Sequence, residues 1–477
     1  MITNLSATEI AQSIRSGNLS PVQVVDAHIA HIEAVNPSIN AVVITTFEKA
    51  RQRAKEAEAA LNHGELWGPL HGVPFTVKDG FEVGEGVPDV CGLVSRVNNR
   101  STQESPLVRR MREAGAILLG KTNVPDNSSD METINIVFGP TRNPWNLTRS
   151  AGGSSGGEGA IIAAGGSPLG LGSDIGGSIR VPSAFTGIVG LRPTGNLLSV
   201  EHFWPPLHAG LDDLVALGPM ARRVEDVALA FDVLCNAQPH TLNPDALRDQ
   251  KVACWYSDGL VPSSSAVRGG VSAAVKALTG AGMVATPGAV AARRLASIGR
   301  AASIKEAERK AWAQGFGNGE TWSPLAELGR TLIGNQRVAS GSLLMWLLMN
   351  TVSRLTNQLG INGTRWREQI HRQLAELIGE QGIVVCPVFP FTAPRLGWTV
   401  RWMAVVTLSS FTTWVNLAGL PSLTLPVGFS SCGMPVGIQI VGNRGSEHTL
   451  LAAGLVIQQA LMPQWIGPYR ESSAGQH

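Results

Sequence analysis

The sequence predicts an α/β protein, in which short strands alternate with helices along one large folded unit. Short apolar runs separated by helical periodicity start near residue 70 and recur along the chain, and strand-like runs return after residue 380. The 477 residues are 44% hydrophobic and only 16% charged, which is enough apolar side chain for a large core. This composition excludes disordered, coiled-coil and collagen-like chains.

The N-terminal part predicts three helices and then a strand. Residues 6–9 and 20–23 have the pattern of capping boxes, and each precedes apolar residues at helical spacing. A charged third helix follows over about residues 47–61. Residues 70–79 then predict a turn and a short strand that ends at Lys78.

The central part alternates in the same way. A helix is expected from about residue 106, leading into a strand that ends near residue 119. Residues 152–177 are rich in glycine and serine and predict a glycine-rich turn, a helix of small residues, a short strand and a second turn. Glycine loses more backbone entropy on folding than any other residue. We therefore expect that these glycines are needed for function or for close packing. An amphipathic helix follows over about residues 222–234.

The C-terminal part begins with an alanine-rich helical region over about residues 255–380. Strands are then expected at residues 383–387, 422–425 and 436–441, and a last helix at about 446–461. No internal repeat and no linker divides the chain. We therefore expect one domain over 1–477, with a core from about 65–245 and 380–465.

The charge and the cysteine content of the chain restrict the kinds of partner and cellular compartment that we expect for it. The 38 basic and 36 acidic residues nearly cancel, which argues against a nucleic-acid partner. The five cysteines are scattered and are expected to be reduced. The N-terminus lacks a secretory pattern, and the longest apolar run, 343–349, is too short to span a membrane. We expect a cytoplasmic monomer or homodimer without a transmembrane segment, acting on a small molecule.

Ser178 is the candidate nucleophile. It follows two glycines and a short strand, and glycines let the chain turn so that successive N–H groups face one point. Acyl transfer needs such donors, because its tetrahedral intermediate carries an oxyanion. The N–H groups of Ile175, Gly176, Gly177 and Ser178 are the candidate oxyanion donors.

A serine nucleophile also needs a base. None of the ten histidines stands in a motif that marks it as one. Lys78 ends an apolar strand, where burial would lower its pKa and free its amine to accept a proton. Ser154, in the first of the two glycine-rich turns, is placed to pass a proton between Lys78 and Ser178.

Other site types fit less well. Gly152, Ser154 and Gly156 match G-x-S-x-G, the nucleophile elbow of esterases, but that motif requires a strand directly before it, and residues 143–149 look like a loop. Residues 170–176 resemble a dinucleotide fingerprint with one residue too many. No spacing typical of metal ligands occurs, so we expect neither metal nor cofactor.

Taken together, residues 152–157 and 174–183 resemble the signature of the amidase signature family. In that resemblance Lys78 is similar to the family's catalytic lysine, Ser154 to its cis-serine and Ser178 to its acyl-enzyme nucleophile. The resemblance covers nearly the whole chain and is weakest over about 255–380. Further similar stretches are residues 120–125, 139–145, 414–422 and 433–439.

The resemblance implies a large, mixed, mostly parallel sheet surrounded by helices, and hydrolysis without a cofactor. It also implies a cis peptide bond before Ser154. Asp174 and Arg180 would brace the loop of the nucleophile, and Ser155 is expected to hydrogen-bond the lysine or simply to stand in the turn.

Within the family, the signature segment is most similar to fatty acid amide hydrolases, although the chain lacks their N-terminal membrane helix. A glutaminase like the one in glutamyl-tRNA amidotransferases is an alternative, but residues 79–84 depart from its pattern. A catalytically inactive binding protein is the other alternative, although such a protein would not need the three catalytic residues.

The substrate pocket is expected to involve residues 126–133, through Asn127, Ser128, Ser129 and Met131. Trp346, within an aromatic stretch at 310–350, would either form an apolar lid or pack in a helical core. We predict hydrolysis of the C–N bond of small apolar or aryl amides in an uncharged pocket. Carbamates (urethanes) and esters are further expected substrates, with water as the second reactant.

Overall fold

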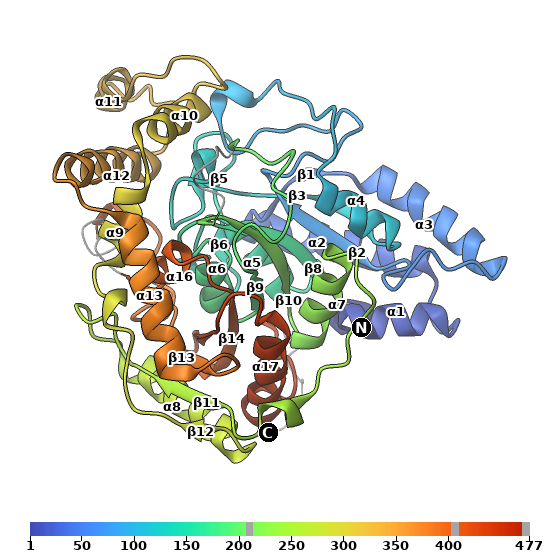
Figure 1. Cartoon of the computed structure of the whole chain (residues 1–477). Helices are drawn as coiled ribbons and strands as arrows, with labels where there is room; N and C mark the ends of the chain where they lie inside the picture. The colour runs from blue at the N-terminus through green and yellow to red at the C-terminus, as the bar shows by residue number, and fades with distance from the viewer. Residues whose placement is uncertain (207–212, 402–409, 470–477) are drawn as a thin grey trace, which may run out of the picture.

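The computed structural model describes residues 1–206, 213–401 and 410–469. Its centre is one sheet of eleven strands in the order β1-β3-β2-β8-β10-β9-β14-β15-β13-β11-β12 (Figure 1). The strands are β1 (Val42–Thr45), β2 (Pro74–Lys78), β3 (Ile117–Thr122), β8 (Leu169–Asp174), β9 (Val189–Arg192), β10 (Ala216–Ala221), β11 (Lys251–Cys254), β12 (Val284–Ala285), β13 (Ile383–Pro387), β14 (Ser422–Phe429) and β15 (Pro435–Val441).

The predicted large mixed sheet is confirmed, but the expected parallel majority is wrong. Only the pairs β2–β3, β2–β8, β11–β12 and β11–β13 are parallel, and the other six neighbouring pairs are antiparallel. The tight turn between β14 and β15, closed by the Ser430 and Met434 backbone groups, leaves no room for a crossover. β10 likewise runs antiparallel to both of its neighbours, β8 and β9.

The N-terminal helices form where their caps predict. Ser6 and Ser20 both close capping boxes, at the starts of α1 (Ala7–Arg15) and α2 (Pro21–Ile39). α3 (Phe47–Asn62) and α4 (Pro106–Glu113) follow, and both agree with the predicted periodicity.

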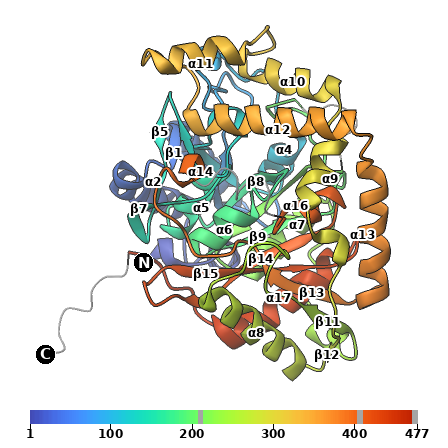
Figure 2. The ribbon, with the colours of Figure 1, turned by 90° about the vertical axis from the view of Figure 1, so that its left-hand side faces the viewer.

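Two of the apolar core clusters lie between the sheet and the helices at the N-terminal and C-terminal ends of the chain. One contains apolar side chains of α1, α4, α7 (Val224–Leu234), α8 (Ser265–Gly280) and α17 (Glu447–Leu461). The other joins α2 and α3 to α5 (Gly156–Ala163), which is buried along its whole length. α6 (Arg180–Thr186) packs against β14 and β15. Helices therefore surround the strands, as Figure 2 shows.

The region from about 255 to 380 is helical as predicted, except for the short strand β12. α9 (Ala296–Ser303) packs on both α12 (Ser340–Gln358) and α13 (Gly363–Ile378), and these helices lie along one side of the molecule (Figure 1). α10 (Glu306–Phe316) and α11 (Pro324–Leu332) complete the group. None of the helices in the described ranges is long and apolar enough to cross a membrane.

Residues 142–150 form a hairpin, where the sequence suggested a loop. β6 (Arg142–Asn143) and β7 (Asn146–Ser150) pair only with each other and not with the main sheet. The short, polar and largely exposed strands explain why no strand was predicted, because alternation is not visible over so few residues.

Candidate active site

Lys78, Ser154 and Ser178 meet beside a cavity of about 140 Å³, and both serines line its wall. Lys78 stands at the C-terminal end of β2, where every residue of the strand is buried. Its Nζ lies 2.5 Å from Ser154 Oγ and 2.8 Å from Ser173 Oγ. The lysine thus has two hydroxyl partners.

Burial changes the acid–base state of Lys78. Its side chain has no exposed surface, and this desolvation lowers its pKa from the usual 10.5 to about 7, although Cys91, Asp174 and Glu158 act in the opposite direction. Near neutral pH a substantial share of Lys78 is therefore the neutral amine, which can accept a proton.

Ser154 follows a cis peptide bond with Gly153, as the resemblance implies. A side chain at Gly153 would have its Cβ only 2.7 Å from the backbone nitrogen of Glu132, so only glycine fits this turn. The residue after it, Ser155, donates its N–H to the carbonyl of Ser178 at 3.1 Å. This bond ties the two glycine-rich turns together.

Ser155 does not contact Lys78 through its hydroxyl. That hydroxyl instead accepts the N–H of Ser173 at 3.3 Å and lies 3.4 Å from the Ser173 carbonyl. The second hydroxyl that hydrogen-bonds Lys78 belongs instead to Ser173, which was not singled out from the sequence. It is the second-to-last residue of β8, directly before Asp174. β8 pairs with β2, and this pairing was not visible in the sequence.

Asp174 and Arg180 brace the loop of Ser178, as expected. The Asp174 carboxylate accepts the N–H groups of Gly177 at 2.9 Å and Ile179 at 3.2 Å, and it forms an ion pair with Arg180 at 2.9 Å. Burial alone would raise the pKa of Asp174, but the Arg180 guanidinium holds it well below its usual range. The carboxylate therefore stays charged and keeps the loop in place.

This bracing changes the set of oxyanion donors. The N–H of Gly177 is already committed to Asp174, so it is not a free donor as the glycine pattern suggested. Among the described residues, the N–H groups of Ile175, Gly176 and Ser178 donate to no protein acceptor. These three are available to a substrate oxygen.

A second buried acid, Glu158, was not singled out from the sequence. Its carboxylate accepts the hydroxyls of Thr76 at 2.7 Å and Thr122 at 2.9 Å. A Cβ at Gly170 would come within 2.0 Å of it, which explains one glycine of β8. Burial raises the pKa of Glu158 to about 8. Near neutral pH this carboxyl group, which lies close enough to influence Lys78, is therefore mostly protonated.

The other wall of the cavity contains the predicted residues Asn127, Ser128, Ser129 and Met131. Trp312, from α10, lies beside them and donates its Nε1–H to Ser129 Oγ at 2.7 Å. Further apolar lining comes from Phe203, Ile304, Met345 and Met349.

Trp346 does not line this cavity. It belongs to an apolar cluster against which Trp312 also packs, and its ring meets Trp322 edge-on at 5.2 Å between centroids. The periodicity of a helix does not reveal which of two tryptophans on neighbouring helices faces a cavity. Trp312 has the position that was expected of Trp346.

The expected absence of charge from the cavity is wrong. Arg300, Glu308 and Asp130 are all part of the lining. The Arg300 guanidinium donates to the carbonyl of Ile175 at 3.4 Å and makes no ion pair with a carboxylate in the described ranges. Burial and the neighbouring Glu132 raise the pKa of Asp130 to about 8. Arg300 therefore contributes a positive charge to the cavity wall beside Ile175 that no carboxylate in the described ranges pairs with.

The model of the family described as Amidase matches residues 23–451. The chain belongs to the amidase family.

Amidase relatives cover almost the whole length. Fatty-acid amide hydrolase 2-B of Danio rerio is 31% identical over 98% of this chain and 91% of its own. An acylamidase of Rhodococcus erythropolis is 34% identical over 94% of this chain and 93% of its own. The structure of 6-aminohexanoate cyclic dimer hydrolase complexed with substrate has a TM-score of 0.79 and 28% identity, covering 98% and 99% of the two chains. This amidase is thus a hydrolase of amide C–N bonds.

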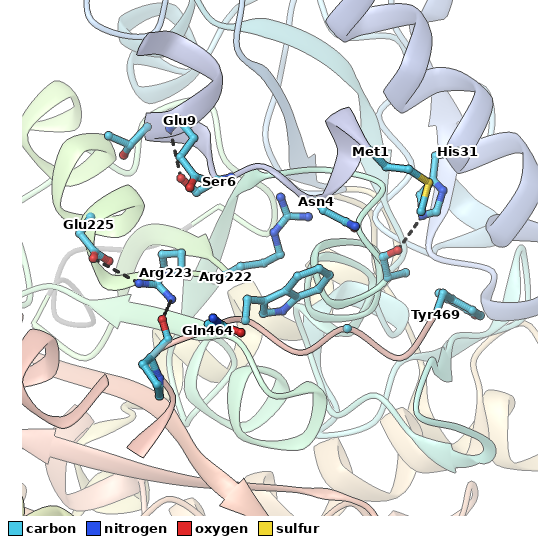
Figure 3. A pocket seen from close by; sticks show the side chains of 15 residues that line it. Met1, Asn4, Ser6, Glu9, His31, Arg222, Arg223, Glu225, Gln464 and Tyr469 are labelled. Atoms are coloured by element: carbon cyan, nitrogen blue, oxygen red, sulfur yellow. Dashed lines mark hydrogen bonds and ion pairs between the residues drawn. The ribbon is translucent and has the colours of Figure 1, made fainter. Parts of the chain in front are cut away.

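The amidase also has a second cavity, of about 670 Å³, between its first residues and the segment 463–469 (Figure 3). Arg222 points into it, donates to the carbonyl of Thr3 at 2.8 Å and stacks against the ring of Trp465. This cavity holds none of the residues predicted to be catalytic, so its larger size does not make it the reaction site.

Proposed function

We propose that this amidase hydrolyses amides through an acyl-enzyme on Ser178, with Ser154 as proton relay and Lys78 as base. The observation that carries the proposal is the contact of 2.5 Å between Lys78 Nζ and Ser154 Oγ, made by a lysine whose pKa is lowered to about 7. A base whose pKa is near the working pH transfers protons most effectively.

The proton transfers follow from this arrangement. Neutral Lys78 takes the proton of Ser154 as Ser154 takes that of Ser178, whose oxygen attacks the amide carbonyl. The N–H groups of Ile175, Gly176 and Ser178 stabilise the oxyanion. Lys78 then returns the proton through Ser154 to the leaving nitrogen, and the amine departs.

Water completes the cycle. It attacks the acyl group on Ser178, and Lys78 again accepts a proton through Ser154. Collapse of the second tetrahedral intermediate breaks the ester bond and returns the proton to Ser178, releasing the carboxylic acid. No metal and no cofactor takes part in these steps.

We further propose that the substrates are small apolar or aryl amides, with aryl carbamates and esters cleaved by the same groups. Met131, Trp312 and Met349 offer flat and flexible apolar surface to an aryl group. Arg300 adds one cation at the edge of the oxyanion loop. We keep the earlier expectations of one domain over 1–477, a monomer or homodimer, and a cytoplasmic location as parts of this proposal.

Two alternatives give different chemistry. A glutaminase of the amidotransferase type would cleave free glutamine as fast as an anilide. An esterase with Ser154 as nucleophile would need a histidine base, whereas the hydroxyl of Ser154 contacts Lys78.

The test is the mass of the intact protein after reaction with a fluorophosphonate or an aryl carbamate. One adduct is expected on the wild type, none on Ser178→Ala, and slower labelling on Ser154→Ala and Lys78→Ala. An adduct that persists in Ser178→Ala but is absent from Ser154→Ala would refute the proposal in favour of the esterase. Circular dichroism of each variant controls for folding.

A further inference from the structure

Three potential metal ligands meet outside the active site, on the surface where α7 and α17 pack together. Asp232 lies near the end of α7, His240 lies in the connection that follows it, and His448 lies in the first turn of α17. They are 8 and 216 residues apart in the chain, so no sequence motif announces the cluster. Figure 1 shows the two helices next to each other.

The two imidazoles converge on the same oxygen. His240 Nδ1 and His448 Nε2 each lie 3.0 Å from Asp232 Oδ1, and the ligand atoms of the three residues all lie within 4.8 Å of one another. The ring centroids are 4.2 Å apart. Two nitrogens and one carboxylate oxygen therefore surround a single point.

We propose that Asp232, His240 and His448 form a binding site for a divalent transition-metal ion, best suited to Zn²⁺. Zinc bonds imidazole nitrogen and carboxylate oxygen at about 2.0–2.1 Å in tetrahedral geometry, which places neighbouring ligand atoms roughly 3.3 Å apart. The nitrogen–oxygen separations of 3.0 Å are a few tenths of an ångström shorter. A small outward rotation of the imidazoles would admit the ion.

The surroundings of Asp232 favour a cation. Its side chain is only 2% exposed, and its second oxygen accepts the backbone N–H of His240 at 2.7 Å, which fixes the carboxylate plane. No lysine or arginine pairs with it among the residues that the structure describes.

The histidines keep the site open to solvent. Their side chains are 52% and 45% exposed, so an ion can enter, and water can fill the fourth position. A bound ion would fasten the connection after α7 to α17. It would therefore stabilise the folded chain, because an unfolded chain does not bring the three ligands together.

The test is titration of the chelator-stripped, full-length protein with Zn²⁺ at pH 7.5, in competition with a chromophoric chelator. We expect one equivalent to bind to the wild type, and the affinity to fall by about tenfold or more in His240→Ala and in His448→Ala, since even second-layer changes have effects of that size. His63→Ala, which removes an exposed histidine at the end of α3, is the matched control and should bind like the wild type.

Thermal unfolding provides a second readout that does not depend on activity. Zn²⁺ should raise the melting temperature of the wild type and of His63→Ala, but not that of His240→Ala. Wild type that binds no Zn²⁺, or a His240→Ala/His448→Ala double variant that binds it as tightly as the wild type, would overturn the proposal. The cluster would then be only a carboxylate shared by two imidazoles.

Discussion

The acid–base state of Lys78 makes a quantitative prediction about activity. If neutral Lys78 is the base, kcat/KM for a neutral anilide follows the neutral fraction of this amine in the free enzyme. With a pKa of about 7, that fraction is roughly 0.9 at pH 8 and roughly 0.1 at pH 6. We therefore expect kcat/KM to fall about tenfold from pH 8 to pH 6 and about tenfold again by pH 5.

The assay is initial-rate release of an aryl amine at constant ionic strength, with Lys78→Met as the matched variant. Lys78→Met should lose about 10²–10⁴-fold in rate, the usual contribution of a general base. Its residual rate should lack the inflection near pH 7, although Glu158 and Asp130 are still present. A wild-type profile that is level from pH 5.5 to pH 8, or an inflection that persists in Lys78→Met, would refute the assignment of Lys78.

The same pKa shift affects stability. The folded-state pKa lies below the unfolded value of about 10.5, so between about pH 7 and pH 10.5 the unfolded chain binds more protons at this residue. The free energy of unfolding of the wild type should thus rise with pH in this window relative to Lys78→Met. The full difference is about 5 kcal/mol, from a pKa that is lowered by about 3.5, at about 1.36 kcal/mol per pKa unit. Chemical denaturation at pH 7 and pH 9.5 measures the part that falls in this interval, about 3 kcal/mol.

Three further substitutions test the cavity and its support. Arg300→Gln should lower kcat/KM for an anilide that carries a carboxylate about tenfold or more relative to its neutral analogue, because a hydrogen bond to a charged group contributes about 1.5–3 kcal/mol. Equal loss of kcat/KM on both substrates would mean that Arg300 only supports the loop. Asp174→Asn should lower the free energy of unfolding by about 3–5 kcal/mol by leaving the buried Arg180 unpaired, and an unchanged denaturation midpoint would contradict this. Trp312→Ala should raise KM severalfold, because Trp312 lines the cavity. Trp346→Ala should leave KM as it is and lower the melting temperature more than Trp312→Ala does, because Trp346 is the more deeply buried of the two; the reverse pattern would show that the cavity wall is misassigned.

The sequence predicts those parts of the site whose geometry is local. Ser178 and Ser154 stand in glycine-rich turns whose purpose can be inferred from neighbouring residues, and Lys78 ends a strand that is apolar throughout. The capping boxes at Ser6 and Ser20 likewise specify their helices within four residues. In each case, the interactions that decide the structure join residues close together in the chain.

The remainder depends on pairing between distant segments. Ser173 reaches Lys78 only because β8 pairs with β2, and Glu158 is a buried acid only because Thr76 and Thr122 bring two hydroxyls to it. Arg300 enters the cavity from a helix more than a hundred residues after Ser178. The residue pattern within one segment does not show which distant segment it will contact. The charge that Arg300 brings to the cavity was therefore not predicted.

The two walls of the cavity come from different stretches of the chain. The reacting groups belong to segments between residues 78 and 178, at the sheet and its turns, whereas Arg300, Trp312 and Met349 belong to α9, α10 and α12. Mutational drift in the helical wall can therefore alter which amides are accepted while the proton-transfer groups stay in place. A laboratory library restricted to the cavity-facing positions of α9, α10 and α12 should change substrate range far more often than it abolishes turnover.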